Sequence, residues 1–480
     1  MGTERVLPAY AEEGRLFDVA DLGSVHFIGI GGVGMSGIAR IMLELGVTVS
    51  GSDAKASKVL EDLRAAGAGI HLGQRAENIG DADTVVVSSA IKPQNPELAA
   101  ALSSGRRVLP RAQALSSVMR GRKPIAVAGT HGKTSTTSML VAALVGCGVD
   151  PSYAVGAELN ATGRNAHLGS GEAFAVEADE SDGSFLLFAP HIGVVTNIEA
   201  DHLDNYGDFQ SVLSAFDTFV DTIDAGGALV LCADDAHAAG LAERAARRGL
   251  RVIDYGQTDA AQLRLRDIDV AAEHTTYTLT GEGVPGELEV RVAAAGEHMA
   301  MNSAAVLGVC LALELPLASA VGGLANYAGV ERRMQLRGVA NAVRVYDDYA
   351  HHPTEVRAQL RAARRVAGDG RIVACFQPHL FSRTAEFARQ FGEALSLADE
   401  VVVMDVYPAR ESAADFPGVT GESISRYVSA PVRFIANRAE VAPALAAAAR
   451  AGDVVLTIGA GDVTELGPQV LAELDGSTDE

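Results

Sequence analysis

Short apolar runs and helical patterns alternate along almost the whole chain. An apolar run at residues 25–30 is followed by a glycine turn, a helical pattern to about Leu45 and a second strand pattern at residues 47–51. Similar apolar runs occur at residues 84–89 and 107–109. Buried parallel strands read as continuous apolar runs, and crossover helices join them. The alternation therefore predicts an α/β protein with parallel sheets.

The pattern restarts twice, which predicts three domains. Residues 119–124 are basic and contain Gly and Pro, so we interpret them as a linker before a new strand at Ile125. A further start lies at residues 342–347, and polar–apolar alternation within residues 262–293 predicts antiparallel strands on the flank of the middle domain. The predicted domains are residues 1–121, 122–336 and 337–480, and other strands are predicted at residues 174–177, 193–196, 371–375, 400–405 and 453–458.

Composition and charge exclude several classes of protein. The 480 residues are 48% hydrophobic, so each predicted domain can bury a core without disulfides or metal. The net charge of −22 argues against a nucleic-acid partner, which requires a basic footprint. Four scattered cysteines without CxxC spacing indicate a reducing cytoplasm. The polar N-terminus lacks a signal-peptide pattern, and no apolar stretch reaches membrane length.

The first glycine turn has the form G-x-G-x-x-G between a strand and a helix. Its glycines are Gly29, Gly31 and Gly34, and Asp53 follows about twenty residues later at the end of the next strand. This arrangement is typical of dinucleotide sites, in which the helix start binds a diphosphate and the acid holds a ribose hydroxyl. The turn alone leaves three interpretations open: NAD or FAD, another diphosphate such as a UDP-sugar, or a turn that serves packing only.

A second glycine turn follows the apolar strand that begins at Ile125. Its strict phosphate-loop pattern fails, because Val127 stands where the first glycine is expected. The turn is short but retains backbone amides at a helix start, a lysine for phosphates and a hydroxyl for Mg²⁺. We therefore predict an ATP site, whose nucleotide-binding residues are Gly129, Thr130, His131, Gly132, Lys133, Thr134 and Ser135.

Two oxygen-rich segments could supply metal ligands beside this turn. Residues 177–182 carry a side-chain oxygen at every position except Ala178, and residues 196–204 contain several further acids and His202. Each follows a predicted strand, and such oxygens suit a hard cation such as Mg²⁺. A solvated acidic loop remains the alternative for either segment taken alone.

Together these motifs resemble those of the Mur ligases, over nearly the whole chain and in the same order. The G-T-H-G-K-T string at residues 129–134 and the D-D-Y-A-H-H-P-T-E string at residues 347–355 are the most specific. The other matching motifs lie at residues 29–37, 87–91, 177–182, 296–302, 331–333, 377–379 and 459–462, together with Asn197, Asp201 and His202.

The resemblance implies a fold and a reaction. The fold would consist of a Rossmann-like UDP-binding domain, a central phosphate-loop ATPase-like domain and a Rossmann-like C-terminal domain. ATP would phosphorylate the lactyl carboxylate of UDP-N-acetylmuramate, and the amine of L-alanine would attack the acyl phosphate to give the amide, ADP and phosphate. This is a cytoplasmic step of peptidoglycan synthesis that uses Mg²⁺. We expect no nucleic-acid or membrane partner and a monomer or weak homodimer.

The resemblance also assigns roles to individual residues. It places Lys133, His202, Arg332 and His351 in catalysis, and Thr134, Glu177 and His202 on Mg²⁺. It implies that ATP contacts Asn302, Arg333 and Asp348 besides the phosphate loop. The UDP-sugar would contact Gly31, Gly32, Val33, Gly34, Asp53, Ser88, Ser89 and Arg383.

Several of these roles have structural alternatives. Arg332 or Arg333 could instead pair with nearby acids, and of the adjacent His351 and His352 we expect at most one to face the site. His298 could be a packed helix-start histidine, and His379 could be structural rather than part of a substrate cleft. For His131 the sequence leaves open whether it shapes the phosphate loop or approaches the γ-phosphate.

Two departures from the family pattern affect the expected site. Several relatives carry a carbamylated lysine near the second Mg²⁺, but this chain has no lysine from Asn197 to Gly226. We expect the Asp217 carboxylate to be a candidate substitute. Leu380 stands where many relatives have arginine, so we assign that cationic role to Arg383.

Competing functions differ in what they leave unexplained. A recycling ligase that adds a murein peptide to the same UDP-sugar is the nearest rival. Folate-type polyglutamate ligases lack the first domain. An NAD-dependent Rossmann dehydrogenase would leave the phosphate loop without a purpose, and a nucleotide-dependent switch protein would leave the third domain without one.

Overall fold

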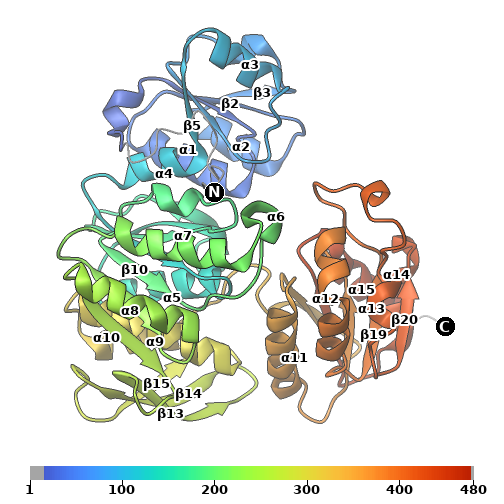
Figure 1. The fold of residues 1–480 in the computed structure, drawn as a ribbon. Coiled ribbons are helices and arrows are strands. Elements are labelled where there is room, and N and C mark those ends of the chain that lie inside the picture. The colour runs from blue at the N-terminus through green and yellow to red at the C-terminus, as the bar shows by residue number, and fades with distance from the viewer. Residues whose placement is uncertain (1–15, 477–480) are drawn as a thin grey trace. The chain divides into compact units, whose positions relative to one another are not determined.

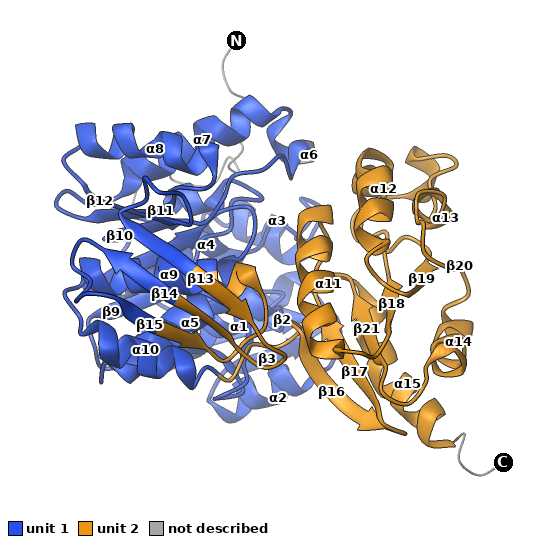
Figure 2. Ribbon diagram, turned by 90° about the horizontal axis from the view of Figure 1, so that it is seen from below, with its two compact units in different colours: residues 1–266, 278–289, 301–327 blue, residues 267–277, 290–300, 328–480 orange. Residues whose placement is uncertain are grey.

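The computed structural model describes residues 16–476, so the polar N-terminal segment and the last four residues lie outside the described range. The chain divides into two compact units. One comprises residues 1–266, 278–289 and 301–327, and the other comprises residues 267–277, 290–300 and 328–480 (Figure 2). The first contains the whole five-stranded sheet and most of a ten-stranded sheet, and the second contains a six-stranded sheet.

The five-stranded sheet, which belongs to the blue N-terminal part of Figure 1, is parallel and has the order β3-β2-β1-β4-β5. Chain order reverses beside β1, and such a switch point forms a crevice at the carboxyl ends of the strands. The elements are η1 (Val19–Leu22), β1 (Val25–Ile28), α1 (Val33–Glu44), β2 (Val49–Asp53), α2 (Lys58–Ala65), β3 (Gly69–Leu72), η2 (Ala76–Ile79), β4 (Thr84–Val87), α3 (Pro96–Ser103), β5 (Arg107–Pro110) and α4 (Arg111–Met119).

Alternate residues of the central strands enter cores on opposite faces of this sheet. Phe27 and Val86 belong to one buried cluster, while Ile28, Val85 and Val87 belong to another. This is the two-residue period of a strand that is covered on both sides, and it explains why β1 and β4 are continuously apolar in the sequence.

The ten-stranded sheet has the order β15-β14-β13-β12-β11-β10-β6-β9-β7-β8. Strand β6 lies between β10 and β9 and is parallel to both, so the carboxyl ends of the three strands lie side by side at one edge of the sheet. The strands are β6 (Lys123–Ala128), β7 (Ser152–Leu159), β8 (Arg164–His167), β9 (Ala173–Glu177), β10 (Ile192–Val195), β11 (Ala228–Cys232), β12 (Arg251–Gly256), β13 (Leu263–Val270), β14 (Thr275–Gly281) and β15 (Leu288–Val292). The helices are α5 (Lys133–Gly146), η3 (Ser184–Leu187), α6 (Leu203–Tyr206), α7 (Phe209–Thr222), α8 (Ala236–Arg247), α9 (Glu297–Ala312) and α10 (Leu317–Ala325).

The six-stranded sheet has the order β16-β17-β21-β18-β19-β20 and is parallel except for the antiparallel pair β16–β17. Its strand β18 again sends alternate residues to opposite cores, with Ala374 and Phe376 in one and Val373 and Cys375 in the other. The elements are β16 (Gln335–Ala340), β17 (Val343–Asp348), α11 (Pro353–Ala367), β18 (Ile372–Phe376), α12 (Phe381–Leu395), β19 (Glu400–Met404), η4 (Ala413–Asp415), α13 (Glu422–Ser425), β20 (Val432–Ile435), η5 (Arg438–Glu440), α14 (Val441–Ala448), β21 (Val454–Ile458), η6 (Asp462–Glu465) and α15 (Leu466–Gly476).

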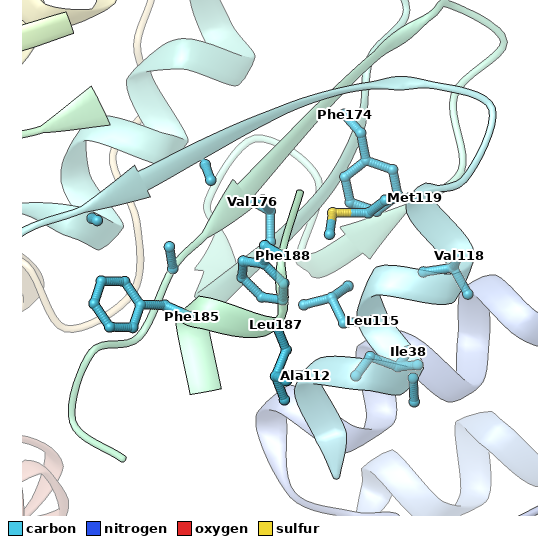
Figure 3. Close-up of a cluster of buried hydrophobic side chains, with 14 of the residues drawn as sticks. Ile38, Ala112, Leu115, Val118, Met119, Phe174, Val176, Phe185, Leu187 and Phe188 are labelled. Atoms are coloured by element: carbon cyan, nitrogen blue, oxygen red, sulfur yellow. The ribbon is translucent and has the colours of Figure 1, made fainter. Parts of the chain in front are cut away.

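The predicted α/β class is confirmed, and the connection in the segment predicted as a linker is short. Helix α4 continues to Met119 and β6 begins at Lys123, so only three residues separate them. Figure 3 shows the reason: Leu115, Val118 and Met119 of α4 lie in one apolar cluster with Phe174 of β9. The cluster also contains Ile38, Ala112, Val176, Phe185, Leu187 and Phe188. A helix that is buried in this way cannot act as a flexible connection.

The sequence also missed some edge strands. Strands β7 and β8 form an antiparallel pair at one edge of the ten-stranded sheet, and β16 precedes the predicted third start. The predicted boundary at residue 337 falls inside β16, so the division into three domains stays a prediction. Among residues 16–476, no helix combines the length and apolar character needed to cross a membrane.

Candidate active site

The short phosphate loop connects β6 to the start of α5. Gly129 has φ 127° and Gly132 has φ 84°, values that side chains rarely tolerate. A Cβ atom on Gly129 would lie 2.1 Å from Thr196 Oγ1, and one on Gly132 would lie 2.8 Å from Asn302 Oδ1. Both glycines are therefore required by backbone conformation and by the close approach of neighbouring residues. The predicted turn exists in its short form.

The second oxygen-rich segment holds this loop from beside it. The backbone N–H of His131 donates to Asn197 Oδ1 at 2.8 Å, and the Thr196 hydroxyl donates to the His131 carbonyl at 2.6 Å. The Glu199 N–H donates to Thr130 Oγ1 at 2.9 Å. The His131 ring lies 3.5 Å from the Glu199 carboxylate. The backbone of His131 therefore shapes the loop, while the sequence-based question about its ring and the γ-phosphate stays open.

Lys133 lies at the centre of the polar contacts of the loop. Its ammonium donates to the Gly129 and Thr130 carbonyls at 2.7 and 3.2 Å and contacts both Glu180 oxygens at 2.7 and 2.9 Å. Burial alone would lower the pKa of Lys133, but the Glu180 and Asp179 carboxylates raise it overall. Lys133 is therefore a fixed positive charge at the start of α5, where phosphates would bind.

Glu180 is the buried acid that accompanies this lysine. Burial raises its pKa to about 7, with a further increase from Asp179 and an opposing effect from Lys133. Its carbonyl accepts a hydrogen bond of 2.5 Å from the Tyr206 hydroxyl. The His202 ring lies 3.8 Å from its carboxylate and 3.6 Å from that of Asp201. His202 itself has φ 56°, a left-handed conformation that is uncommon outside glycine and often occurs at functional sites.

Two of the predicted magnesium ligands meet directly. The Thr134 hydroxyl donates to Glu177 Oε1 at 3.0 Å, and the other Glu177 oxygen accepts the Gly156 N–H at 2.8 Å. A hydroxyl and a carboxylate at this separation, beside a glycine cradle and a lysine, fit Mg²⁺ bound with nucleotide phosphates. His202, the third predicted ligand, contacts Glu180 and Asp201 and belongs to the acidic group on the other side of Lys133.

The predicted adenine contact and the substitute carboxylate have different surroundings. Asn302 of α9 is buried and lies against Gly132, since a Cβ atom added to this glycine would lie 2.8 Å from Asn302 Oδ1. Asp217 of α7 is half exposed and pairs with Arg244 of α8 at 3.9 Å. Its described contacts include neither Glu177 nor His202, so nothing supports the hypothesis that Asp217 replaces a carbamylated lysine.

The first glycine turn lies at the carboxyl end of β1, where the sequence predicts it. The Gly31 N–H donates to Asp53 Oδ2 at 2.9 Å, so this carboxylate closes the turn. Val33 is exposed and begins α1. Ser88 and Ser89 follow β4, the neighbour of β1, at the same edge of the sheet. The structure therefore brings the predicted UDP-sugar residues of this sheet to one edge, and their substrate contacts stay predictions.

Arg332, a predicted catalytic residue, is held within the second unit. Its Nε lies 3.2 Å from Asp347, and its terminal nitrogen donates to the Gly459 and Gly461 carbonyls at 2.5 and 3.3 Å. Asp347 is fully buried and also accepts hydrogen bonds from Thr457 and Thr464. The alternative that this arginine pairs with an acid is therefore present in the structure, although the acid is buried rather than on the surface.

The adjacent acid has a different environment. Asp348 accepts the N–H groups of Met334 and Ala350, both at 2.8 Å, and burial raises its pKa to about 6 despite the opposing effect of Arg333. Arg333 also lies over the Tyr349 ring at 5.3 Å. His298 is half-buried, and desolvation followed by Arg333 lowers its pKa to about 4. His298 is thus a neutral packed histidine, as one of the two alternatives expected.

The two adjacent histidines have different surroundings. His352 is buried and caps α11, where its ring accepts the Thr354 N–H and Glu355 completes a capping box. The His351 ring instead lies 3.4 Å from Glu355 and packs near His379, with ring centroids 6.2 Å apart. The His351 ring takes no part in the capping box, and its catalytic role stays a prediction. Arg383 of α12, predicted to contact the UDP-sugar, is buried.

Sequence reasoning missed three polar contacts at these sites. Glu180 pairs with Lys133, Asp347 anchors Arg332, and Arg111 pairs with Asp179 at 3.7 Å. All three acids lie in the acidic motifs that the sequence singled out. Their partners are 15 to 68 positions away in the chain, and only the strand order brings them together.

Comparison with known proteins gives matches along most of the chain. Residues 24–123 match the family model described as "Mur ligase family, catalytic domain", residues 127–310 the "Mur ligase middle domain", and residues 332–461 the "Mur ligase, glutamate ligase domain".

Similar proteins and structures agree with these matches. A UDP-N-acetylmuramate–L-alanine ligase of Saccharopolyspora erythraea is 52% identical, over 100% of both chains. One from Kineococcus radiotolerans is 54% identical, over 94% of this chain and 96% of its own. The crystal structure of a UDP-N-acetylmuramate–alanine ligase from Thermotoga maritima has a TM-score of 0.79 and 27% identity, covering 95% and 99% of the two chains. The crystal structure of a murein peptide ligase from Psychrobacter arcticus has a TM-score of 0.71 and 25% identity, covering 94% of this chain and 99% of its own. The chain belongs to the Mur ligase family.

Proposed function

We propose that this chain joins L-alanine to the lactyl carboxylate of UDP-N-acetylmuramate through an acyl phosphate, with conversion of ATP to ADP and phosphate. The relatives that are about half identical over the full length carry this activity in their names. The observation that carries the proposal is the polar cluster at the short phosphate loop, where Lys133 contacts Glu180 and Thr134 contacts Glu177.

The cluster suits phosphoryl transfer to a carboxylate. A free carboxylate is a poor electrophile, and a phosphate group supplies the leaving group that an amine can displace. The amides at the start of α5 and the Lys133 ammonium would bind and orient the ATP phosphates. Thr134 and Glu177 would hold Mg²⁺, which would offset the negative charge of the phosphates when bound.

The second unit would contribute groups to the same reaction. His351 has a ring that takes no part in the helix cap, and Asp348 is a buried acid with a raised pKa beside Arg333. In this proposal these residues contact ATP or the alanine substrate, and the first glycine turn holds the UDP part. The cytoplasmic location and the monomeric or weakly dimeric state stay predictions from the sequence.

The recycling ligase is the second candidate. The Psychrobacter arcticus structure has the same fold, but it is 25% identical, whereas the alanine ligases of the comparison reach 54%. A dehydrogenase is disfavoured because it gives no role to the Lys133 cluster. The Asp53 carboxylate, which would hold a ribose in such an enzyme, accepts a hydrogen bond from Gly31.

Phosphate release tests the proposal. Purified protein is mixed with UDP-N-acetylmuramate, Mg²⁺-ATP and one amino acid at a time. We expect release with L-alanine and little with D-glutamate. UDP-N-acetylglucosamine, which lacks the lactyl carboxylate, is the matched control and should give none. Release only with a tripeptide would assign the recycling activity instead, and no release with any amine would refute ligase function.

A further inference from the structure

Arg111 is a charged residue of the first unit that none of the motifs includes. It is the first residue of α4 and follows β5 directly. In the sheet order, β5 is separated from β1 by β4 alone, and all three strands are parallel. The carboxyl ends of these strands share one edge, so Arg111 lies at the same edge as the glycine turn after β1.

The guanidinium of Arg111 packs against that turn. A Cβ atom on Gly34 would lie 2.8 Å from an Arg111 terminal nitrogen and 3.1 Å from its Cδ. Gly34 is the second residue of α1, whose N-cap Gly32 provides no side-chain hydrogen bond to the helix. The first turn of α1 also has no acidic residue. The amides of this helix start and the guanidinium therefore lie side by side as positive groups, next to the Asp53 carboxylate that accepts the Gly31 N–H.

Arg111 also lines a cavity that extends to the acidic segment after β9. The cavity has a volume of about 90 Å³, and its lining includes Val33, Gly34, Asn165, Glu177 and Asp179. Arg111 is the one basic side chain among its lining residues. Asn165 of β8 donates to the Val33 carbonyl at 2.6 Å, which fixes the wall between the glycine turn and the acidic segment.

The guanidinium of Arg111 has more N–H donors than its described contacts use. Its side chain is 28% exposed, and within residues 16–476 its guanidinium makes one described ion pair, with Asp179 at 3.7 Å. That separation exceeds a hydrogen bond, whereas a guanidinium carries five N–H donors in a planar fork. The guanidinium packs on the start of α1, in a residue that lines the cavity, and has N–H donors that no described hydrogen bond uses.

We propose that Arg111 binds the diphosphate of the UDP-sugar and leaves Asp179 when this substrate occupies the glycine turn. This inference rests on the proposed function and adds a specificity residue to it. A guanidinium binds two phosphate oxygens at once, and charge-assisted hydrogen bonds of this kind are stronger than neutral ones. The diphosphate would gain both the α1 amides and Arg111, while Asp179 would lose this ion pair and keep its electrostatic interaction with Lys133.

Equilibrium binding to the full-length chain, in the absence of ATP, tests this role. The probes are UDP-N-acetylmuramate, UDP and uridine, measured by calorimetry or by competition. In Arg111→Met we expect UDP-N-acetylmuramate and UDP to bind about 10- to 100-fold more weakly, by similar factors, with uridine unchanged. Arg111→Lys keeps the charge but not the fork and should fall between. The KM for ATP should stay within about twofold, because ATP binds the other loop.

Two control variants separate phosphate binding from loss of an ion pair. Arg244→Met removes the same charge from an exposed pair with Asp221 and Asp217 and should leave UDP binding unchanged. Asp179→Asn breaks the Arg111 pair but keeps the guanidinium, so UDP should bind as well as before or better. Weaker UDP binding in Asp179→Asn would show that the pair acts through folding, which would overturn the inference.

The remaining outcomes are equally decisive. Equal UDP binding in Arg111→Met and the unchanged chain would overturn the inference. Weaker binding of UDP-N-acetylmuramate with unchanged binding of UDP would also overturn it, because the guanidinium would then act at the sugar end. If the unchanged chain itself bound no UDP-N-acetylmuramate, the proposed function would fail rather than the role of Arg111.

Discussion

The two glycine turns of the first unit share a backbone plan and differ in what surrounds them. Each joins a buried parallel strand to a helix, at Gly29–Gly34 after β1 and at Gly129–Gly132 after β6. At the first, one acid closes the turn and one arginine packs on it. At the second, a lysine is buried among three carboxylates, those of Glu177, Asp179 and Glu180.

The difference teaches that the backbone of such a turn specifies phosphate binding but not chemistry. Helix-start amides attract any phosphate. A cation without metal ligands suits a diphosphate that is only held, whereas a lysine with carboxylates suits a phosphate that is transferred with Mg²⁺. At both turns a neighbouring strand supplies an acid: Asp53 ends β2 beside the first turn, and Glu177 ends β9 beside the second. The following predictions test whether the two turns are as independent as this comparison requires.

The largest effect is expected at the lysine of the second turn. Lys133→Ala should reduce turnover by about 1000-fold or more, because it removes the cation that orients the phosphates. Binding of UDP-N-acetylmuramate should stay within about twofold, since it depends on the first turn. Phosphate release and calorimetry measure the two. Lys123→Ala, which removes an exposed ion pair with Glu172 at the start of β6, is the matched control. Loss of both properties in Lys133→Ala would show that the turns are not independent.

A methyl group should destabilise the second turn more than the first. Gly129→Ala combines φ 127° with a contact of 2.1 Å to Thr196 Oγ1, so we expect a loss of about 2 to 4 kcal/mol in the free energy of unfolding. In Gly32→Ala the nearest atom is 3.4 Å away, and the loss should stay below about 1 kcal/mol. Thermal or denaturant unfolding compares them. Similar losses would mean that both turns are equally constrained.

A smaller effect should distinguish the metal requirement of the turns. Glu177→Gln should raise the Mg²⁺ concentration for half-maximal activity by about tenfold, because an amide is a weaker ligand for a hard cation than a carboxylate. Asp53→Asn at the first turn should change the KM for the UDP-sugar and leave the Mg²⁺ requirement unaltered. Activity across a magnesium titration measures both. An equal magnesium shift in the two variants would contradict the assignment of the metal to the second turn.

The smallest effect concerns pH and is confined to the second turn. Burial raises the pKa of Glu180 to about 7 from its usual 4.5. The folded chain therefore holds this proton more tightly than the unfolded chain, so the contribution of Glu180 to stability is present below pH 4.5 and is lost as pH rises through about 7. Glu180→Gln cannot titrate, and its unfolding midpoint should gain about 1 to 3 °C on the unchanged chain between pH 5 and pH 8.

The matched control for this pH effect has the opposite sign. The hydrogen bond with Lys123 lowers the pKa of the exposed Glu172. Any contribution of Glu172 is present above its unfolded pKa and is lost in acid. Glu172→Gln should therefore show no gain in unfolding midpoint between pH 5 and pH 8. If Glu180→Gln also shows none, Glu180 is already ionised at pH 5.

The predictable parts of the fold are those in which a local pattern decides the outcome. Strands such as β1 and β4 are covered on both faces, so their apolar runs are unambiguous. By contrast, β8 and β16 are edge strands with mixed polar residues, which no apolar run announces. Residues 120–122 contain two arginines and a glycine, which suggested a linker. The sequence did not show that α4 before them is buried, because its packing partners in β9 and η3 lie far along the chain.

The same distinction holds for the candidate site. Lys133 and Thr134 were predicted from the motif at residues 129–134, where backbone turn and side chains are neighbours in the sequence, and Glu177 was predicted from its own acidic motif. Their roles stay predictions. The pairs Lys133–Glu180 and Arg111–Asp179 depend on which strands are adjacent, and a single sequence does not supply that order. The hypothesis for Asp217 rested on counting along the chain from His202, and α7 turns that residue toward Arg244.

The apolar cluster around α4 bears on how this chain can be cut into pieces for expression. A fragment that ends near residue 121 would retain Leu115, Val118 and Met119 but lose Phe174 and its neighbours, which cover them in the complete chain (Figure 3). Such a fragment would expose these apolar side chains of α4 to water and would associate or precipitate. Fragments for binding studies should therefore keep β9 and η3 together with the first sheet, although the chain between α4 and β6 looks like a convenient place to divide it.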